Sequence, residues 1–342
     1  MSPPRVMPSI GASMPVTVTG FALFSPAGLD WRHALARVTE RDGGSVRSLP
    51  PLPETVDFDA AALLGKKGLR VLDRASCLLA ATIRSAAHEA GLGDALAGAE
   101  TALVAGTCYA FAESYATFVD DAAEHGPTLA NPTFFARAIA SAAPSLAALR
   151  LGITGAVVPV CGGLCAGGTA LAVAHQLVAA GRFPRAVAAS VATVEPRVAE
   201  LTRRSCPGRR PIELAAAMIV EPLDTSSPDA EPSRIRLEES RIMELSAPQV
   251  LPEPSSVPAT AVSTWIVFGD EPIGRPALAP AARLLRPEWD LGTGVGVAGL
   301  AEAVLAAGLL RSAAGGQPEA GAIAASTVDP WDDKQCLFVF RR

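Results

Sequence analysis

Histidine is scarce in this sequence, and its placement excludes a class of mechanisms. The chain of 342 residues has four histidines, and the last of them is His175. Histidine is the side chain whose ordinary pKa lies near neutral pH, which makes it the usual general acid or base. Any mechanism that needs a histidine within the last 167 residues of this chain is therefore excluded.

Positive charge is also in short supply. The 29 basic residues are outnumbered by 34 acidic ones, which gives a formal net charge of -5. Non-specific binding to phosphate backbones needs a basic field, so nucleic acid is not an expected partner. The only lysines are Lys66, Lys67 and Lys334. The one compact basic group in the sequence consists of Arg203, Arg204, Arg209 and Arg210.

The six cysteines form no CxxC pair and do not group with histidine, so we expect neither a metal nor a cofactor. A disulfide framework would be unusual in a chain of this size, which favours reduced thiols in the cytoplasm. Cys77, Cys161 and Cys336 lie in apolar patterns and are predicted to be small buried hydrophobes. Residues 294–299 match GxGxxG, but without a clear preceding strand we favour close helix packing over a dinucleotide site.

Long apolar segments are interrupted. Residues 151–174 carry no charge and are long enough to cross a bilayer, but they contain six glycines and Pro159. We interpret them as a short strand at 156–160, a glycine-rich corner and a helix at 169–180, and expect no membrane span. Residues 1–14 lack the apolar run of a signal peptide and are predicted to be a loose tail.

Apolar residues make up 49% of the chain, enough for a large core, and strand and helix patterns alternate along it. This alternation predicts an α/β protein with mainly parallel sheets covered by helices, in an N-terminal half (15–225) and a shorter C-terminal half (233–342). The predicted strands are 16–20, 101–105, 156–160, 186–194, 212–221, 263–268, 322–326 and 336–340. The predicted helices are 31–38, 73–90, 134–150, 169–180 and 297–310.

Several short motifs resemble the β-ketoacyl synthases of the thiolase superfamily. They are Val16-Thr17-Val18-Thr19-Gly20 with Pro26-Ala27-Gly28, Ala90-Gly91-Leu92, Asn131-Pro132, Gly155 before a strand and elbow, and Glu195. The resemblance implies a thiolase-like fold of two pseudo-repeated α/β halves with a layered α-β-α-β-α core. It also implies a nucleophilic cysteine at a strand-to-helix elbow, where the helix N-terminus lowers the thiol pKa, and two histidines that follow the cysteine in sequence.

The chain departs from this family at each of its chemical positions. Counting along the elbow places the family's nucleophile on Leu164, with Cys165 one residue beyond it. The two histidine positions fall on Phe268 and Thr293, and the family's lysine falls on Glu288. The glycine-rich strand turn is replaced at residues 329–333. A leucine cannot form a thioester, so we expect the ketosynthase reaction to be lost.

A ketosynthase scaffold without its nucleophile and histidines resembles the chain-length factor of type II polyketide synthases, and its compact form favours the polyene-forming, highly reducing type. The resemblance implies a heterodimer with an active ketosynthase and an acyl carrier protein that carries the growing chain. It also implies that bulky side chains limit the acyl tunnel at the partner interface. The aromatic residues in the corresponding segments are Tyr109, Phe111, Tyr115, Phe118, Phe134 and Phe135.

Four alternatives stay open at this point. The aromatic set is explained equally well by ordinary core packing. The arginine group at 203–210 is either a solvated loop or a contact for the carrier protein or partner. Cys165 could act as the nucleophile of a divergent condensing or acyl-transfer enzyme, since it lies beside a predicted helix N-terminus. A homodimeric pseudo-ketosynthase that holds acyl chains is the remaining alternative.

Overall fold

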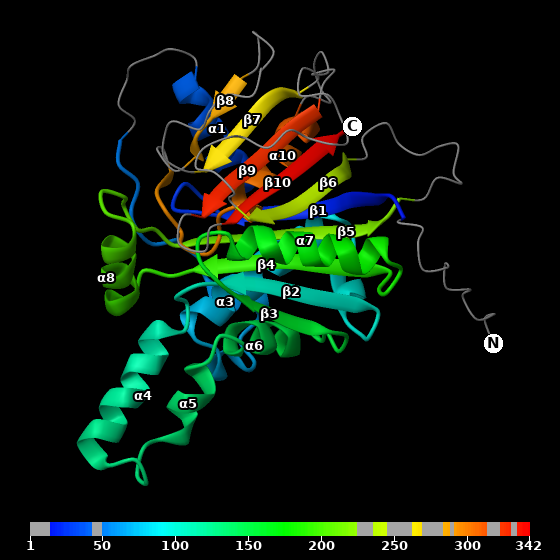
Figure 1. The fold of residues 1–342 in the computed structure, drawn as a ribbon. Coiled ribbons are helices and arrows are strands. Elements are labelled where there is room, and N and C mark those ends of the chain that lie inside the picture. The colour runs from blue at the N-terminus through cyan, green and yellow to red at the C-terminus, as the bar shows by residue number, and fades with distance from the viewer. Residues whose placement is uncertain are drawn as a thin grey trace, which may run out of the picture.

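The computed structural model describes residues 14–42, 50–223, 235–244, 262–268, 283–287, 291–312, 322–329 and 334–342. The predicted tail therefore falls almost entirely outside the described residues, as does the proposed division between the halves, at 225 and 233. The chain is an α/β structure built on a ten-stranded sheet (Figure 1). The strands are β1 (Val16–Phe24), β2 (Thr101–Thr107), β3 (Val157–Cys161), β4 (Arg185–Ala192), β5 (Leu214–Pro222), β6 (Ile235–Glu244), β7 (Val262–Phe268), β8 (Arg283–Leu285), β9 (Ala322–Asp329) and β10 (Lys334–Arg341).

The strand order shows an internal repeat. It is β3-β2-β4-β5-β1-β6-β10-β9-β7-β8, so β6 to β10 repeat the arrangement of β1 to β5 in mirror order. The two sets of five strands meet where β1 and β6 pair antiparallel, from Val16 opposite Leu237 to Val18 opposite Ile235. Each terminal edge of the sheet is the third strand of its set, β3 in one and β8 in the other.

The sheet is mixed, which corrects the prediction of mainly parallel strands. Four neighbouring pairs are parallel and five are antiparallel. A parallel pair needs a crossover of a dozen or more residues. Only residues 330–333 separate β9 from β10, so these two strands pair antiparallel.

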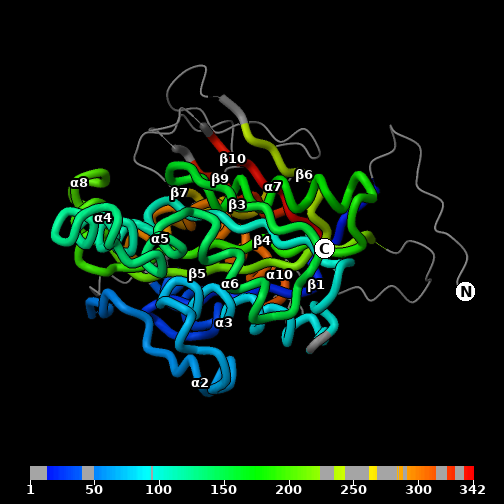
Figure 2. The backbone as a smooth tube through the Cα atoms, turned by 90° about the horizontal axis from the view of Figure 1, so that it is seen from below, coloured from blue at the N-terminus to red at the C-terminus, as the bar shows by residue number. Residues whose placement is uncertain are grey.

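The helices form layers on and between the two sets of strands. The helix α3 (Arg74–Glu89) packs on β1, β4 and β5, and α6 (Ala142–Leu151) packs beside it. The helix α7 (Ala166–Ala179) covers the opposite face, as Figure 2 shows, and also contacts β6. The helix α10 (Leu300–Ser312) contacts β1 and β5 as well as β7 and β9. Thus α7 and α10 lie between the two sets of strands, and residues 245–261, which connect β6 to β7, lie outside the described residues.

The remaining helices are short or lie at the periphery. The body carries α1 (Trp31–Asp42), α2 (Ala60–Leu64) and α8 (Pro196–Ser205). The predicted single helix at 134–150 is wrong, because α5 (Pro132–Arg137) and α6 are separate helices joined by a turn at 138–141. Figure 1 shows α4 (Ala112–His125) and α5 projecting from the body as an arm.

Glycines allow the two central helices to touch. A Cβ placed on Gly299, where φ is +87°, would lie 2.7 Å from the Cα of Gly168. A Cβ on Gly296 would lie 2.6 Å from the backbone nitrogen of Cys108. The GxGxxG segment therefore serves close packing, and the interpretation favoured from the sequence is confirmed.

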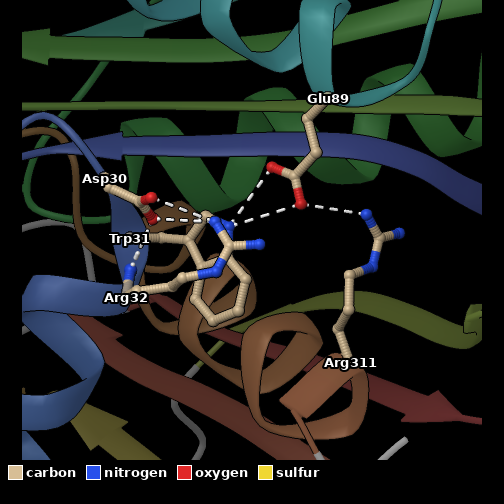
Figure 3. Close-up of polar contacts among 5 residues, drawn as sticks. All are labelled: Asp30, Trp31, Arg32, Glu89 and Arg311. Carbon is tan, nitrogen blue, oxygen red and sulfur yellow. Dashed lines mark hydrogen bonds and ion pairs between the residues drawn. The ribbon is translucent and has the colours of Figure 1, made fainter.

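A polar cluster fastens the outer helices to α10 (Figure 3). The Trp31 indole N–H donates to the Glu89 carboxylate at 3.2 Å, and Arg311 pairs with the same carboxylate at 2.9 Å. The Arg311 guanidinium lies 4.6 Å from the ring centroid of Phe21, which packs on Trp31. Gly308 makes room for the indole, since a Cβ there would lie 2.6 Å from Trp31 Cε3. These contacts join α1, α3 and α10 across the boundary between the halves.

In the part of the chain that the structure describes, no helix combines the length and the apolar character needed to cross a membrane. The uncharged stretch 151–174 is divided among the end of α6, β3, the elbow and α7. The predicted burial of Cys161 is wrong, because Cys161 is exposed at the end of the edge strand β3.

Replacement of Gly299 by alanine should destabilise the fold by about 3 kcal/mol, because it adds a steric clash with α7 to an unfavourable backbone conformation. Gly208→Ala is the matched control: its φ is +78°, and nothing lies within 4 Å of the added Cβ. It should cost about 1 kcal/mol. Urea unfolding measures both, and equal losses would contradict the packing role of Gly299.

Candidate functional site

The strand-to-helix elbow carries the residues that the sequence pointed to. After β3, Gly162 and Gly163 turn the chain, Leu164 follows, and Cys165 is the N-cap of α7. Leu164 is 4% exposed. It belongs to a small apolar cluster of buried side chains, on which Tyr109 also packs. The cluster consists of Cys108, Leu164, Cys206, Val295 and Ala298.

Cys165 is turned away from this cluster. It is 2% exposed and belongs to the main hydrophobic core between the two sets of strands. Its Sγ donates to the carbonyl oxygen of Thr327 on β9, at 3.6 Å. A one-residue step along a helix N-terminus rotates the side chain by about 100°, which explains the different surroundings of Leu164 and Cys165. The thiol is therefore not presented to a substrate in this conformation.

The two degenerate histidine positions carry no acid or base. Thr293 is buried, its N–H donates to the carbonyl of Arg210 at 2.9 Å, and its own carbonyl accepts from Ile212 at 3.1 Å. The segment from Thr293 reaches the elbow, because Val295 lies in the same cluster as Leu164. Phe268 is the last residue of β7 and pairs with Thr327, but its side chain, Glu288 and residues 330–333 lie outside the described residues.

A buried carboxylate near the elbow was missed in the sequence. Glu302 lies in the first turn of α10, and its Oε2 accepts from the backbone N–H of Gly299 and from the Thr327 hydroxyl. Complete burial raises the pKa of Glu302 to about 7, and the hydrogen bonds only partly oppose that rise. The signal that could have found it is a glutamate three residues after a helix-starting glycine, as in a capping box.

The aromatic residues divide between the body and the arm. The Tyr109 hydroxyl hydrogen-bonds Ser205 Oγ at 2.9 Å, and burial raises the pKa of Tyr109. Phe111 is the N-cap residue of α4. On the arm, Phe118 of α4 meets Phe135 of α5 with ring centroids 5.5 Å apart.

The arm keeps its large apolar side chains at the surface. None of the residues of α4 and α5 is buried, although Phe134 and Phe118 are partly covered. The large hydrophobic side chains exposed on or beside the arm are Tyr115, Val119, Leu129, Phe135 and Ile139. Ordinary core packing therefore does not explain the aromatic residues of the arm.

The site thus combines a strand-to-helix elbow with a buried apolar cluster around Leu164. A family model matches residues 14–205, more than half of the chain, and its description is the N-terminal domain of β-ketoacyl synthases. The chain belongs to the β-ketoacyl synthase family. None of the curated protein sequences matches it.

Solved structures extend the likeness over nearly the whole chain. One is the ishigamide ketosynthase/chain length factor, with a TM-score of 0.73 and 19% identity over 96% of this chain and 99% of that one. The AntDE:AntF complex, a type II PKS acyl-carrier protein with its ketosynthase bound to the hexaketide, matches with a TM-score of 0.72 and 15% identity over the same shares. A β-ketoacyl synthase from Burkholderia phymatum STM815 gives 0.72 and 14%, again over 96% and 99%. These similarities confirm the thiolase-like ketosynthase fold.

The arginine group at 203–210 contributes to this ketosynthase-like fold. Arg210 donates to the carbonyls of Leu52 and Leu291, and so ties the loop before α2 to the segment before Thr293. Arg204 pairs with Glu200 at 2.7 Å, one turn away on α8, and Arg203 lies 3.8 Å from Glu54. Arg203 and Arg204 remain exposed, Arg209 is partly buried, and the group's contact with a carrier protein stays a prediction.

Replacement of Glu302 by glutamine should remove a pH dependence of stability. The raised pKa means that the folded chain holds this proton more tightly than the unfolded chain, whose pKa is near 4.5. The resulting stabilisation, about 3 kcal/mol, is complete below pH 4.5 and is lost as the pH rises through 7. The urea concentration at the midpoint of unfolding should fall as the pH rises from 4 to 8 in the native chain. The fall should be smaller in Glu302→Gln. The exposed Glu200→Gln serves as control, and an unchanged slope in Glu302→Gln would contradict the assignment.

Proposed function

We propose that this chain is a non-catalytic chain-length factor, which pairs with an active ketosynthase and shapes the tunnel for a growing polyketide chain. The observation that carries the proposal is Leu164. The family resemblance assigns Leu164 to the nucleophile position of the elbow, and apolar side chains surround it in the structure. Such a subunit contributes shape and burial rather than a chemical step.

The exposed edge strand of the sheet favours the presence of a partner subunit. Among the strands that the structure describes, β3 pairs only with β2, and its five residues are partly or fully exposed. Three of the five are valines, so the strand is a short apolar surface on which another chain could pack, although Pro159 limits its backbone pairing. Helix α6 packs against β3 and connects it to the arm, where the exposed aromatic residues lie. We infer that the β3 edge and the arm together form the interface with the ketosynthase.

The proposed tunnel would explain the bulky aromatic side chains of the arm. Tyr115, Phe118 and Phe135 are bulky, and they stand on a projection that a partner must cover. In the heterodimer they would end the partner's tunnel and limit the number of extensions. An acyl carrier protein would bring the chain to the ketosynthase, and a polyene product stays a prediction.

The rate at which Cys161 is alkylated should report formation of the heterodimer. Cys161 is exposed on β3, so it should react with iodoacetamide in the isolated chain, whereas the buried Cys165 should not. Addition of the partner ketosynthase should slow alkylation of Cys161 more than tenfold, as mass spectrometry would show, while an unrelated protein should not. A chain that stays a monomer in the presence of that ketosynthase would contradict the proposal.

Shortening the arm's aromatic side chains should lengthen the product. Phe118→Ala removes the ring that packs on Phe135, and Tyr115→Ala removes a bulky exposed side chain, so a reconstituted synthase should make longer chains. Leu201→Ala is the control, because Leu201 is an exposed apolar residue of α8, outside the arm. Mass spectrometry of the products measures the change. An unchanged product length in both aromatic variants would contradict the proposed role of the arm in the tunnel.

A further inference from the structure

Helix α8 holds the base of the arm at both of its ends. The backbone N–H of Arg197, in the first turn of α8, donates to the Glu113 carboxylate at 3.0 Å, and the Arg197 guanidinium pairs with Asp120. At the other end of α8, the Ser205 hydroxyl hydrogen-bonds the Tyr109 hydroxyl at 2.9 Å, shortly before α4 begins. We call Glu113, Asp120 and Arg197 the arm clamp.

The first turn of α8 takes its acceptor from the arm. The N-cap residue, Glu195, makes no side-chain cap hydrogen bond, and its carboxylate accepts from the Thr193 hydroxyl. The N–H groups in the first turn of a helix have no partner within the helix and favour a negative charge beside them. The Glu113 carboxylate meets both conditions, so a side chain of α4 completes the N-terminus of α8.

Little apolar packing holds the arm in place. None of the residues of α4 and α5 is buried, and α4 packs mainly on α5 and α8. A segment with few buried contacts changes its orientation at a low cost in free energy. The polar contacts with α8 are therefore the direct restraint on how α4 is turned relative to the body.

The clamp and the aromatic side chains lie on opposite faces of α4. A helix turns by about 100° per residue, so Glu113 and Asp120, which are two turns apart, lie on one face. Tyr115 and Phe118 lie about 140° to 200° around the helix from Glu113. Phe118 packs on Phe135 of α5, and Tyr115 is 54% exposed. A rotation of α4 on α8 would therefore move both aromatic rings.

We propose that the arm clamp is a positioning device, which sets the place of Tyr115 and Phe118 in the tunnel and thereby narrows the range of product lengths. The inference rests on the proposed function, because it names the residues that control the same site. The clamp residues act through the aromatic side chains and do not themselves contact the acyl chain. Arg197 and Asp120 are 43% and 64% exposed, so their ion pair contributes little to folding, and its loss should reorient the arm without unfolding the chain.

The distribution of product lengths in a synthase reconstituted with the partner ketosynthase tests the proposal. Asp120→Ala and Arg197→Gln should each raise the share of products longer than the native one about fivefold, with an unchanged midpoint of thermal unfolding. Arg197→Lys keeps the charge and should retain the native distribution. The double variant should match the single variants, because all of them remove the same ion pair. Arg32→Gln is the control, since it breaks an exposed ion pair with Asp30 at the start of α1 and should leave the product lengths unchanged.

The outcomes separate the clamp from the proposed function. If the native chain forms no complex with the ketosynthase, or if Tyr115→Ala and Phe118→Ala leave the product length unchanged, the clamp and the proposed tunnel fail together. If those two variants lengthen the product and Asp120→Ala keeps the native distribution, only the clamp is refuted. A lower yield of Asp120→Ala at the native product length would also refute it, because the ion pair would then serve assembly of the subunits. Additive effects in the double variant would refute the ion pair as the cause.

Discussion

The fold depends on the close contact between the backbones of α7 and α10. Gly168 and Gly299 leave no room for a Cβ at the point where the two central helices meet, and Gly168 donates its N–H to the carbonyl of Ala298. Because α7 follows β3 and α10 follows β8, this contact fixes one set of five strands against the other.

Packing and backbone hydrogen bonds hold the segments around the elbow. Leu164 packs with Val295 in one apolar cluster, and Thr293 is held by backbone hydrogen bonds to Arg210 and Ile212. The buried Glu302 accepts a hydrogen bond from the backbone N–H of Gly299 at the start of α10. These contacts need no reactive group, so they are available whether or not the elbow carries out chemistry.

Sequence patterns predicted the elements whose periodicity was undisturbed. Most strands of the first half were placed within two or three residues, and the family resemblance supplied the layers. The strand β6 was missed because its alternation of Ile235 and Leu237 is broken by a bulge at Glu238, where Val339 pairs with Glu239 and Phe340 with Leu237. The exposure of Cys161 was missed because local apolarity does not show whether a strand lies in the middle or at the edge of a sheet.

Charge was the property that the sequence placed least well. Arg203, Arg204, Arg209 and Arg210 stand together in the sequence, yet the fold uses Arg210 for backbone carbonyls and gives Arg204 a carboxylate one turn away. Arg70, Arg137 and Arg150 come from three separate segments, and the packing of α5 and α6 on residues 65–71 brings these segments together. The density of charge along the sequence therefore does not show which charges the fold pairs and which it brings together at the surface.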